Sequence, residues 1–493
     1  MQSINHYNIL NWYDFKKNSS ILEIVYEESF LKNKTKEVNI KKLDSIKEKY
    51  DYIVMVDVFQ HASLYTKEDP YNCVLKKVKS LLKNKGHLLL AVNNRFGLKY
   101  FAGFPEDNTN KSFDGILGYK DTKEVKTFTK KEICELIKIF KNNKFYYPYP
   151  NYKNTLEIMN DNSINRINPT SINNPLDQNI VTVFNEREVN KQFITNGIAD
   201  IFADCFLIDL SDDKVEYEAD YLKISSNRND KFSICTELNL KANKVIKKPL
   251  TKESISHLQA MSNKKWKSGI ISTLKYSWQD NKLICKMMKN RNLSSYLDEY
   301  LLNDDLDSFW NLLKKFKDNI YISDYSSYIS NDRFIEVFGD KTVEKDLRWS
   351  SCGNIDISPN NIFIVDENKW IAIDHEWTFE FPISAEYMLW SSLNYYYTNS
   401  ICSNKIEYGE LLKFIEIDDN ILEIFNEWQH HFIYDYVGTT DILYKVNEIL
   451  DLQQIEELKK EVYAAEFIMD STSWKITKPL RMIMDLIRGN KHE

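Results

Sequence analysis

Three residues suited to metal-assisted transfer chemistry lie close together in the segment CGNIDISPNNIFIVDENKWIAIDHEW, which spans 352–377. Asp356 precedes the apolar run IFIV, Asn361 adjoins it, and Asp374 ends the next run, WIAI. One carboxylate can orient an attacking hydroxyl group and accept its proton. A second carboxylate and an amide oxygen are suitable ligands for Mg²⁺, which offsets charge on transferred phosphate groups. The residue types therefore indicate phosphoryl transfer.

The spacing of these residues predicts that they meet in space. IFIV and WIAI have the composition of strands, and DENK is a polar turn between them. A hairpin brings its two ends together, so Asp356, Asn361 and Asp374 are expected at one rim. A structural interpretation stays open, in which the two aspartates only cap the ends of the hairpin.

The Asp-x-x-x-x-Asn interval followed by a strand ending in IDHEW resembles the protein-kinase-like superfamily, especially aminoglycoside and choline kinases. The resemblance implies that Asp356 is the catalytic base and that Asn361 and Asp374 bind Mg²⁺ in complex with ATP. One departure concerns Asn354, which stands where that family usually has a histidine. This departure puts the activity in question more than the fold.

The preceding region, 186–290, has mostly strand patterns, with a helix predicted for TKESISHLQAMS. The kinase resemblance implies a phosphate-binding lysine on the strand before that helix, held by a glutamate of the helix. Lys247 is the first candidate and Lys248 the second, because neighbouring strand residues face opposite sides. Glu253 is the nearest acidic candidate. Each of these residues has the alternative of being a solvated surface charge.

Two further features of this region would contact the nucleotide. SSNRNDK (225–231) is the candidate phosphate-covering turn, in which Arg228 or Lys231 would replace the amides of a glycine-rich loop. Met287 and Met288 follow the strand pattern KLICK, and backbone groups near them would receive adenine. The two methionines are equally compatible with an ordinary core position.

The N-terminal part alternates strand and helix patterns, which predicts a parallel α/β sheet. A helix over 72–86 is expected to end with Gly86 as C-cap, and Thr129 with Glu132 forms a capping box before another helix. YDYIVMVDVFQHA and LLKNKGHLLLAVNN resemble the second half of class I S-adenosylmethionine methyltransferases. NRFGLKYFAGFPEDNTNKSFDGILGY resembles methyltransferase-like domains of bacterial surface-polysaccharide proteins.

The cofactor half of this methyltransferase-like region departs from the family pattern. No glycine lies between Glu23, in its LEI setting, and Gly86, although a glycine-rich turn normally approaches the cofactor there. Only about 25 residues separate Val25 from Tyr50, too few for two crossovers with helices. We therefore predict no S-adenosylmethionine binding. Asp57 and His61, near the carboxyl edge of the sheet, are expected to cap the following segment.

The C-terminal segment STSWKITKPLR (471–481) resembles a short motif of bacterial O-antigen and capsule assembly proteins. Residues 471–488 can form a basic amphipathic helix, which suits a membrane surface or a partner helix. An ordinary terminal helix packed on the preceding domain is the alternative.

The composition bounds the remaining possibilities. A chain of 493 residues is too long for one core, and its net charge of −7 argues against a nucleic-acid partner. The seven cysteines are scattered, as expected for reduced thiols in the cytoplasm. No signal peptide or membrane-spanning run is evident, so we expect a cytoplasmic protein, with or without peripheral contact with the inner face of the membrane.

The predicted fold is multidomain α/β plus α+β: a truncated Rossmann-like methyltransferase sheet, a bilobal protein-kinase-like domain and a helical tail. The expected divisions are a methyltransferase-like domain (1–155), a linker (156–185), an N-lobe (186–290), a C-lobe (291–450) and the tail (451–493).

The leading functional hypothesis is a phosphotransferase that uses ATP and Mg²⁺ on a glycan end or small sugar precursor in bacterial surface-polysaccharide biosynthesis. The alternatives are a non-catalytic scaffold among glycan-assembly proteins and an S-adenosylmethionine-dependent methyltransferase with an atypical cofactor loop.

Overall fold

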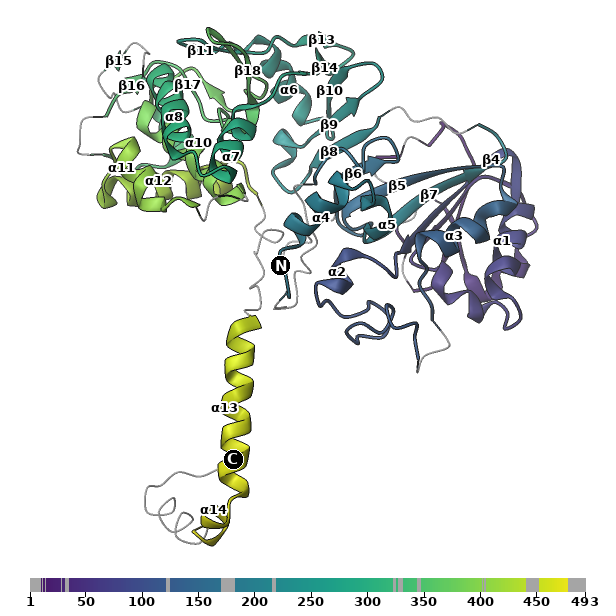
Figure 1. Cartoon of the computed structure of the whole chain (residues 1–493). Coiled ribbons are helices and arrows are strands. Elements are labelled where there is room, and N and C mark those ends of the chain that lie inside the picture. Colours follow the sequence, from purple (N-terminus) through teal and green to yellow (C-terminus); the bar gives the residue numbers. More distant parts are fainter. Residues whose placement is uncertain are drawn as a thin grey trace.

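The computed structural model in Figure 1 describes residues 10–477, except for residues 11, 14, 28, 32–34, 121–124, 170–181, 215–218, 322–324, 327–330, 344–346, 401, 403–404 and 440–451. It is a mixed α/β structure with one large sheet and helices on both sides of the molecule.

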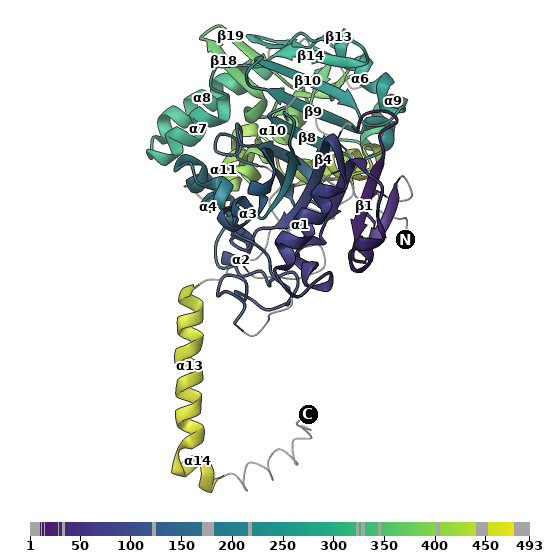
Figure 2. The ribbon, with the colours of Figure 1, turned by 90° about the vertical axis from the view of Figure 1, so that its right-hand side faces the viewer.

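A twelve-stranded sheet takes its strands from residues 21–286, as Figure 2 shows from the side. Its first four strands in spatial order pair in parallel, and all later neighbours pair antiparallel. The spatial order is β2 (Lys36–Asn39), β1 (Ile21–Val25), β3 (Tyr50–Val56), β4 (Leu82–Asn93), β7 (Cys205–Ser211), β5 (Asn142–Pro150), β6 (Thr155–Asn160), β8 (Tyr221–Ser225), β9 (Ile234–Asn239), β10 (Lys244–Pro249), β14 (Lys282–Lys286) and β13 (Ser277–Gln279).

The pairing of β6 with β8 joins the two regions that the sequence divides. Glu157 of β6 lies opposite Lys223 of β8, and the buried Glu157 carboxylate accepts a hydrogen bond from the Tyr221 hydroxyl at 2.8 Å. The expected linker, 156–185, therefore begins inside a strand. Its Asn-rich flanks obscured the short apolar run that forms β6.

Strand β7 is a second correction. The sequence analysis assigned the strands of 186–290 to one lobe, but β7, which lies in that range, pairs with β4 and β5 and is antiparallel to both. All residues of β7 are buried, including Asp209, whose carboxylate accepts a hydrogen bond from the Tyr13 hydroxyl at 2.9 Å. The sequence of a buried strand does not show which other strands it pairs with.

The parallel region has short connections. Helix α1 (Pro70–Ser80) ends before the expected C-cap, because β4 begins at Leu82 and includes Gly86. A Cβ atom on Gly86 would lie 3.0 Å from the Lys83 carbonyl oxygen and 3.1 Å from that of Tyr50, so close backbone approach favours glycine here. Helix α3 (Lys130–Leu136) has the predicted capping box of Thr129 and Glu132.

Between Val25 and Tyr50 the chain makes two connections between parallel strands, which the sequence analysis excluded only for crossovers that contain helices. The parallel strand β2 lies between these two residues in the chain, and the return to β3 runs through the short 3₁₀ helix η1 (Ile40–Ser45). Both connections fit because neither contains an α-helix in the described residues.

The remaining elements surround the predicted hairpin, which is confirmed: β18 (Ile362–Asp366) pairs antiparallel with β19 (Lys369–Ala372). The hairpin extends to β12 (Ile271–Thr273) and β11 (Lys267–Ser268). A short three-stranded sheet consists of β15 (Tyr325–Ser326), β16 (Trp349–Ser350) and β21 (Ile383–Ser384). A two-stranded sheet consists of β17 (Gly353–Asn354) and β20 (Thr378–Phe379). The helices are α2 (Leu98–Phe101), α4 (Glu186–Thr195), α5 (Ala199–Phe202), α6 (Ser254–Asn263), α7 (Leu293–Leu302), α8 (Leu306–Ile320), α9 (Asp332–Phe338), α10 (Ala385–Asn399), α11 (Tyr408–Ile415), α12 (Asp419–His430) and the π-helix η7 (His431–Tyr436).

The tail begins with helix α13 (Leu452–Asp470), which starts where the sequence predicted, and continues into α14 (Thr472–Ile476). Both views show α13 extending away from the rest of the molecule, and residues 459–470 are all exposed. The predicted amphipathic segment 471–488 lies partly outside the described residues. No helix of the described chain is long and apolar enough to cross a membrane.

Candidate active site

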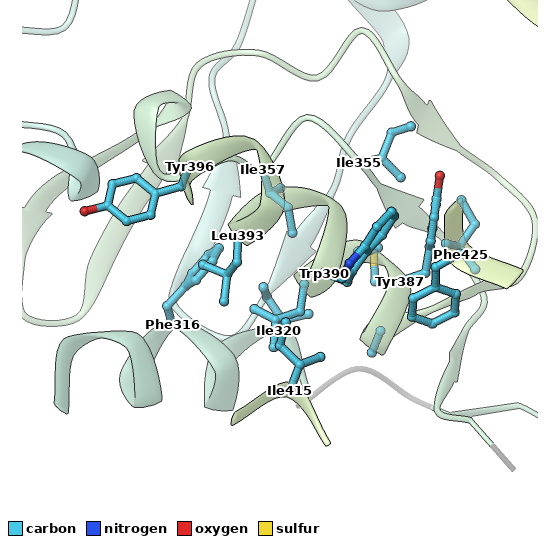
Figure 3. Close-up of a cluster of buried hydrophobic side chains, with 14 of the residues drawn as sticks. Phe316, Ile320, Ile355, Ile357, Tyr387, Trp390, Leu393, Tyr396, Ile415 and Phe425 are labelled. Atoms are coloured by element: carbon cyan, nitrogen blue, oxygen red, sulfur yellow. The ribbon is translucent and has the colours of Figure 1, made fainter. Parts of the chain in front are cut away.

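The segment that carries Asp356 is fixed by the hydrophobic core beneath it. Ile355 and Ile357 flank the aspartate, and both are buried among side chains of α8 and α10 (Figure 3). The Ser392 hydroxyl of α10 donates a hydrogen bond to the Ile357 carbonyl oxygen at 3.0 Å. Alternation along the Ile-Asp-Ile sequence buries the two isoleucines and leaves Asp356 half-buried between them.

The structure brings Asp356, Asn361 and the end of β19 together. The Asn361 Nδ2 atom donates to the Asp356 carbonyl oxygen at 2.9 Å. The backbone N–H of Trp377 donates to the Asp356 carboxylate at 2.6 Å, and that of Ile373 donates to the Asn361 carbonyl oxygen at 2.9 Å. The two ends of the hairpin are therefore tied to one another by direct hydrogen bonds.

Lys247 joins this group from the large sheet. Its ammonium lies 2.9 Å from Oδ1 of Asp374, and the lysine is only 6% exposed. Lys248 faces the other side of β10 and pairs with Glu237 at 2.5 Å. Burial acts to lower the pKa of Lys247, but Asp374, Tyr276 and Glu376 together outweigh it and raise that pKa, so the ammonium stays charged.

Glu253 does not pair with Lys247. It is exposed at the N-cap of α6, one residue before the helix begins, whereas the Lys247 ammonium is directed to Asp374. Met287 and Met288 are half-buried directly after β14, and the backbone N–H of Met287 donates to the Asn243 carbonyl oxygen at 3.2 Å.

Glu376 is the functional candidate that the sequence analysis missed. Its buried carboxylate accepts a hydrogen bond from His257 Nε2 of α6 and forms an ion pair with Arg228 Nη1, both at 2.9 Å, and Lys264 donates to its carbonyl oxygen. Burial acts to raise the pKa of Glu376, but Arg228 and the hydrogen bond from His257 lower it to about 2. The glutamate of IDHEW was visible in the sequence, whereas its partners were not.

The surroundings of Asp356 favour its protonated form. Burial raises the pKa of its carboxyl group well above the usual range, and the neighbouring Asp374 and Glu376 carboxylates add to this shift. Burial lowers the pKa of His375 to about 4, so this imidazole, stacked on Tyr276 with ring centres 4.8 Å apart, is neutral at pH 7. Burial also lowers the pKa of Lys264.

The donor set fits magnesium better than a metal held by protein alone. Among the described residues, no group of three or more His, Cys, Asp and Glu side chains is arranged to hold a metal ion. Asn361 uses its Nδ2 atom within the loop, which leaves its amide oxygen as the donor that could join Asp374. Mg²⁺ commonly takes one or two protein oxygens and completes its shell with water and phosphate.

At the turn after β1, where the methyltransferase resemblance implies a cofactor-binding loop, the side chains bind one another. The buried Glu23 carboxylate accepts from the Ser29 hydroxyl and from the Phe30 N–H, both at 2.7 Å. The Tyr26 ring stacks on His61, with centres 4.2 Å apart. Glu23 therefore holds the turn after β1. The aromatic side chain of Tyr26 lies in this turn, where the methyltransferase family normally has glycine.

Asp57 contacts the segment that follows it through Gln60, whose Nε2 atom donates to its carboxylate at 2.5 Å, although the N-cap position of the 3₁₀ helix Phe59–Leu64 is Val58. Asp57 has a positive φ of 57° at the end of β3, and its carboxylate accepts from the Tyr152 hydroxyl at 2.7 Å and pairs with Lys153 at 2.6 Å. These partners come from the connection between β5 and β6, so Asp57 ties that connection to the sheet.

Comparisons with known proteins give limited matches. No family model and no curated protein matches the chain. Similar solved structures include the plantazolicin methyltransferase BamL in complex with a triazolic desmethylPZN analog and SAH, at 11% identity, with 39% of this chain and 77% of that chain covered and a TM-score of 0.20. They also include two structures of the bifunctional kinase-methyltransferase WbdD, at 10% and 9% identity, each covering 90% of this chain and 88% of that chain, with TM-scores of 0.19 and 0.20. At such TM-scores a similarity defines neither the fold nor the function of this chain.

Proposed function

We propose that the chain is an ATP- and Mg²⁺-dependent phosphotransferase whose site consists of Lys247, Asp356, Asn361 and Asp374. The observation that supports this proposal most directly is the ion pair of the buried Lys247 ammonium with the half-buried Asp374 carboxylate at 2.9 Å, beside the hydrogen-bonded Asp356 segment. A buried lysine and a site carboxylate are costly to desolvate, and phosphate binding gives a reason for both.

Each residue has a separate task in this proposal. The Asp356 carboxylate, in its ionised form, accepts the proton of the attacking hydroxyl. Lys247 binds phosphate oxygens, and Asp374 holds the lysine in place. Asn361 fixes the Asp356 backbone with its amide nitrogen and offers its amide oxygen to a cation. When bound, Mg²⁺ would be held by Asn361 and Asp374 and would offset the charge of the phosphates.

The proposed acceptor is a hydroxyl group of a glycan end or of a small sugar precursor. Support for this class comes from the resemblance of 94–119 and 471–481 to surface-polysaccharide proteins. The exposed apolar residues of the tail, such as Phe467 at 80% and Ile476 at 71%, support contact with a glycan-assembly protein or a membrane surface. Removing 471–493 should then move the protein out of the membrane or complex fraction without loss of folding.

The N-terminal domain is proposed to lack methyltransferase activity. The stacked Tyr26 and His61 rings and the internal hydrogen bonds of Glu23 support this view, because both use groups near the expected cofactor turn. The domain would then have a structural role, because its strands belong to the same sheet as the strand that carries Lys247.

Thermal stability with added ligands tests the proposal, because a ligand that binds only the folded state raises the melting temperature. We expect stabilisation by ATP with Mg²⁺ and none by S-adenosylmethionine. A response to S-adenosylmethionine alone would favour the methyltransferase hypothesis, and no response to either would favour the scaffold hypothesis.

A further inference from the structure

The connection between β8 and β9, residues 226–233, lies at the end of the sheet that faces the candidate site. Ser225 at the end of β8 pairs with Ile234 at the start of β9, and Lys247 pairs with Thr236 two residues further along β9. We call this connection the strap. It contains no glycine.

The strap is fixed to the helical lobe, defined as residues 291–439. The Asn229 N–H donates to the Val437 carbonyl oxygen at 2.9 Å, and its Nδ2 atom donates to that of Tyr436 at 3.1 Å. Gly438 has a φ of 70°, and a Cβ atom there would lie 2.6 Å from Asn229 Nδ2. Phe232 packs against Trp377, with ring centres 4.9 Å apart. These contacts give the strap a defined position across the two regions.

Arg228 extends from the strap into the site. Its side chain is 10% exposed, and its Nη1 atom pairs with the Glu376 carboxylate at 2.9 Å. Its Nε atom donates to the Ser225 carbonyl oxygen at 3.3 Å. Its Nη2 atom is buried and has no hydrogen-bond partner among the residues that the structure describes. A buried charged donor without an acceptor is costly, which calls for an explanation.

Glu376 and Trp377 connect the Arg228 guanidinium to the other site residues. Glu376, which holds Arg228, is two residues from Asp374, and Trp377 donates its N–H to Asp356. The guanidinium carbon lies 6.0 Å from the centre of the Trp377 ring. Arg228 therefore contacts Glu376 in the segment after β19, two residues from Asp374, which pairs with Lys247.

We propose that the Nη2 atom of Arg228 binds a phosphate oxygen of the nucleotide, so that the strap recognises phosphate by a fixed guanidinium instead of by glycine amides. This inference rests on the proposed function, because it names a phosphate contact of that site. An arginine suits this task since its planar group can hold Glu376 with one nitrogen and phosphate with another.

The substitution Arg228→Lys tests this contact, because lysine keeps a positive charge for Glu376 but loses the second guanidinium nitrogen. We expect the melting temperature without ligand to stay near that of the wild type. The affinity for ATP with Mg²⁺ should fall by about tenfold, whereas the affinity for adenosine should not change. Calorimetry with both ligands measures the two affinities.

The structure directs Lys231, the alternative phosphate candidate of the sequence analysis, toward Phe232 and Tyr436, so Lys231→Met is the matched control on the same strap. The Lys231 ammonium lies 4.7 Å from the centre of the Phe232 ring and 4.9 Å from that of Tyr436, so this change removes a charge without touching Glu376. It should leave the ratio of ATP to adenosine affinity unchanged.

The possible outcomes separate this inference from the proposed function. If the wild type binds no ATP, the proposed function is wrong and the phosphate contact falls with it. If the wild type binds ATP and Arg228→Lys binds it equally well, only the role of Arg228 is wrong. Equal loss of ATP and adenosine affinity would also overturn that role, because it would indicate a distorted site.

Discussion

At the scale of single residues, the two aspartates of the site have the same charge but different partners. Asp374 pairs with a buried ammonium, whereas the Asp356 carboxylate accepts a backbone N–H and lies near two other carboxylates. Substitution of each by asparagine should therefore have a different effect on stability and on ligand binding.

Asp374→Asn removes the counterion of Lys247 and a carboxylate of the proposed cation site. We expect the free energy of unfolding to fall by about 1–3 kcal/mol, since a buried ammonium loses its partner. Stabilisation by ATP with Mg²⁺ should be lost as well. Chemical denaturation with and without ligand measures both effects, and Lys248→Met is the control because Lys248 faces away from the site. Undiminished ATP binding would remove Asp374 from the site.

Asp356→Asn should change how stability depends on pH. The folded-state pKa of Asp356 is raised, so between the unfolded value of about 4 and the folded value the folded state binds more protons than the unfolded state. Its contribution to stability is present at low pH and is lost as the pH rises through the folded pKa. The variant should therefore melt above the wild type at about pH 8 but not at about pH 4. An unchanged difference across this range would contradict the raised pKa.

The sequence predicted that Asp356, Asn361 and Asp374 lie close together, because strand alternation and short spacing limit where such side chains can lie. It did not identify the partners of Glu376, since Arg228 and His257 are more than a hundred residues away in the chain. Contacts of that range depend on how separate elements pack, which local patterns do not report.

At the scale of elements, the hairpin and the Asp356 segment depend on the core of the helical lobe. The confirmed pairing of β18 with β19 positions one side of the site, and the buried Ile357 fixes the other. The strand pattern was sufficient to predict the hairpin. It was not sufficient to assign β7, because the period of a strand does not specify its neighbours.

Ile357→Ala tests this coupling of core and site. The side chain is fully buried, so its truncation should lower the free energy of unfolding by about 2–5 kcal/mol, and Ile357→Val by about 1 kcal/mol. Turnover should fall even in the folded fraction, because the neighbouring Asp356 shifts. Denaturation curves and turnover per folded molecule measure the two effects. A variant that is destabilised but fully active would show that the core does not position Asp356.

At the scale of the whole molecule, one sheet links the N-terminal region to the strand that carries Lys247. The sequence predicted the strands on both sides but placed a linker where β6 continues the sheet toward β8. Because all neighbours are hydrogen-bonded, the division of the chain at 155 and 186 does not correspond to a break in the described structure.

Fragments of the chain test this organisation. A fragment of residues 1–160 lacks β7, so β4 and β5 lose the strand that pairs with both of them and expose unpaired backbone groups. A fragment of residues 1–212 retains β7 and exposes only the edge of β6 that pairs with β8. We expect the longer fragment to be soluble with a cooperative melting transition, and the shorter fragment to aggregate. Size-exclusion chromatography and thermal denaturation compare the two. Cooperative folding of residues 1–160 alone would show that β7 is an accessory of this sheet, and the N-terminal domain would then end where the sequence first placed its boundary.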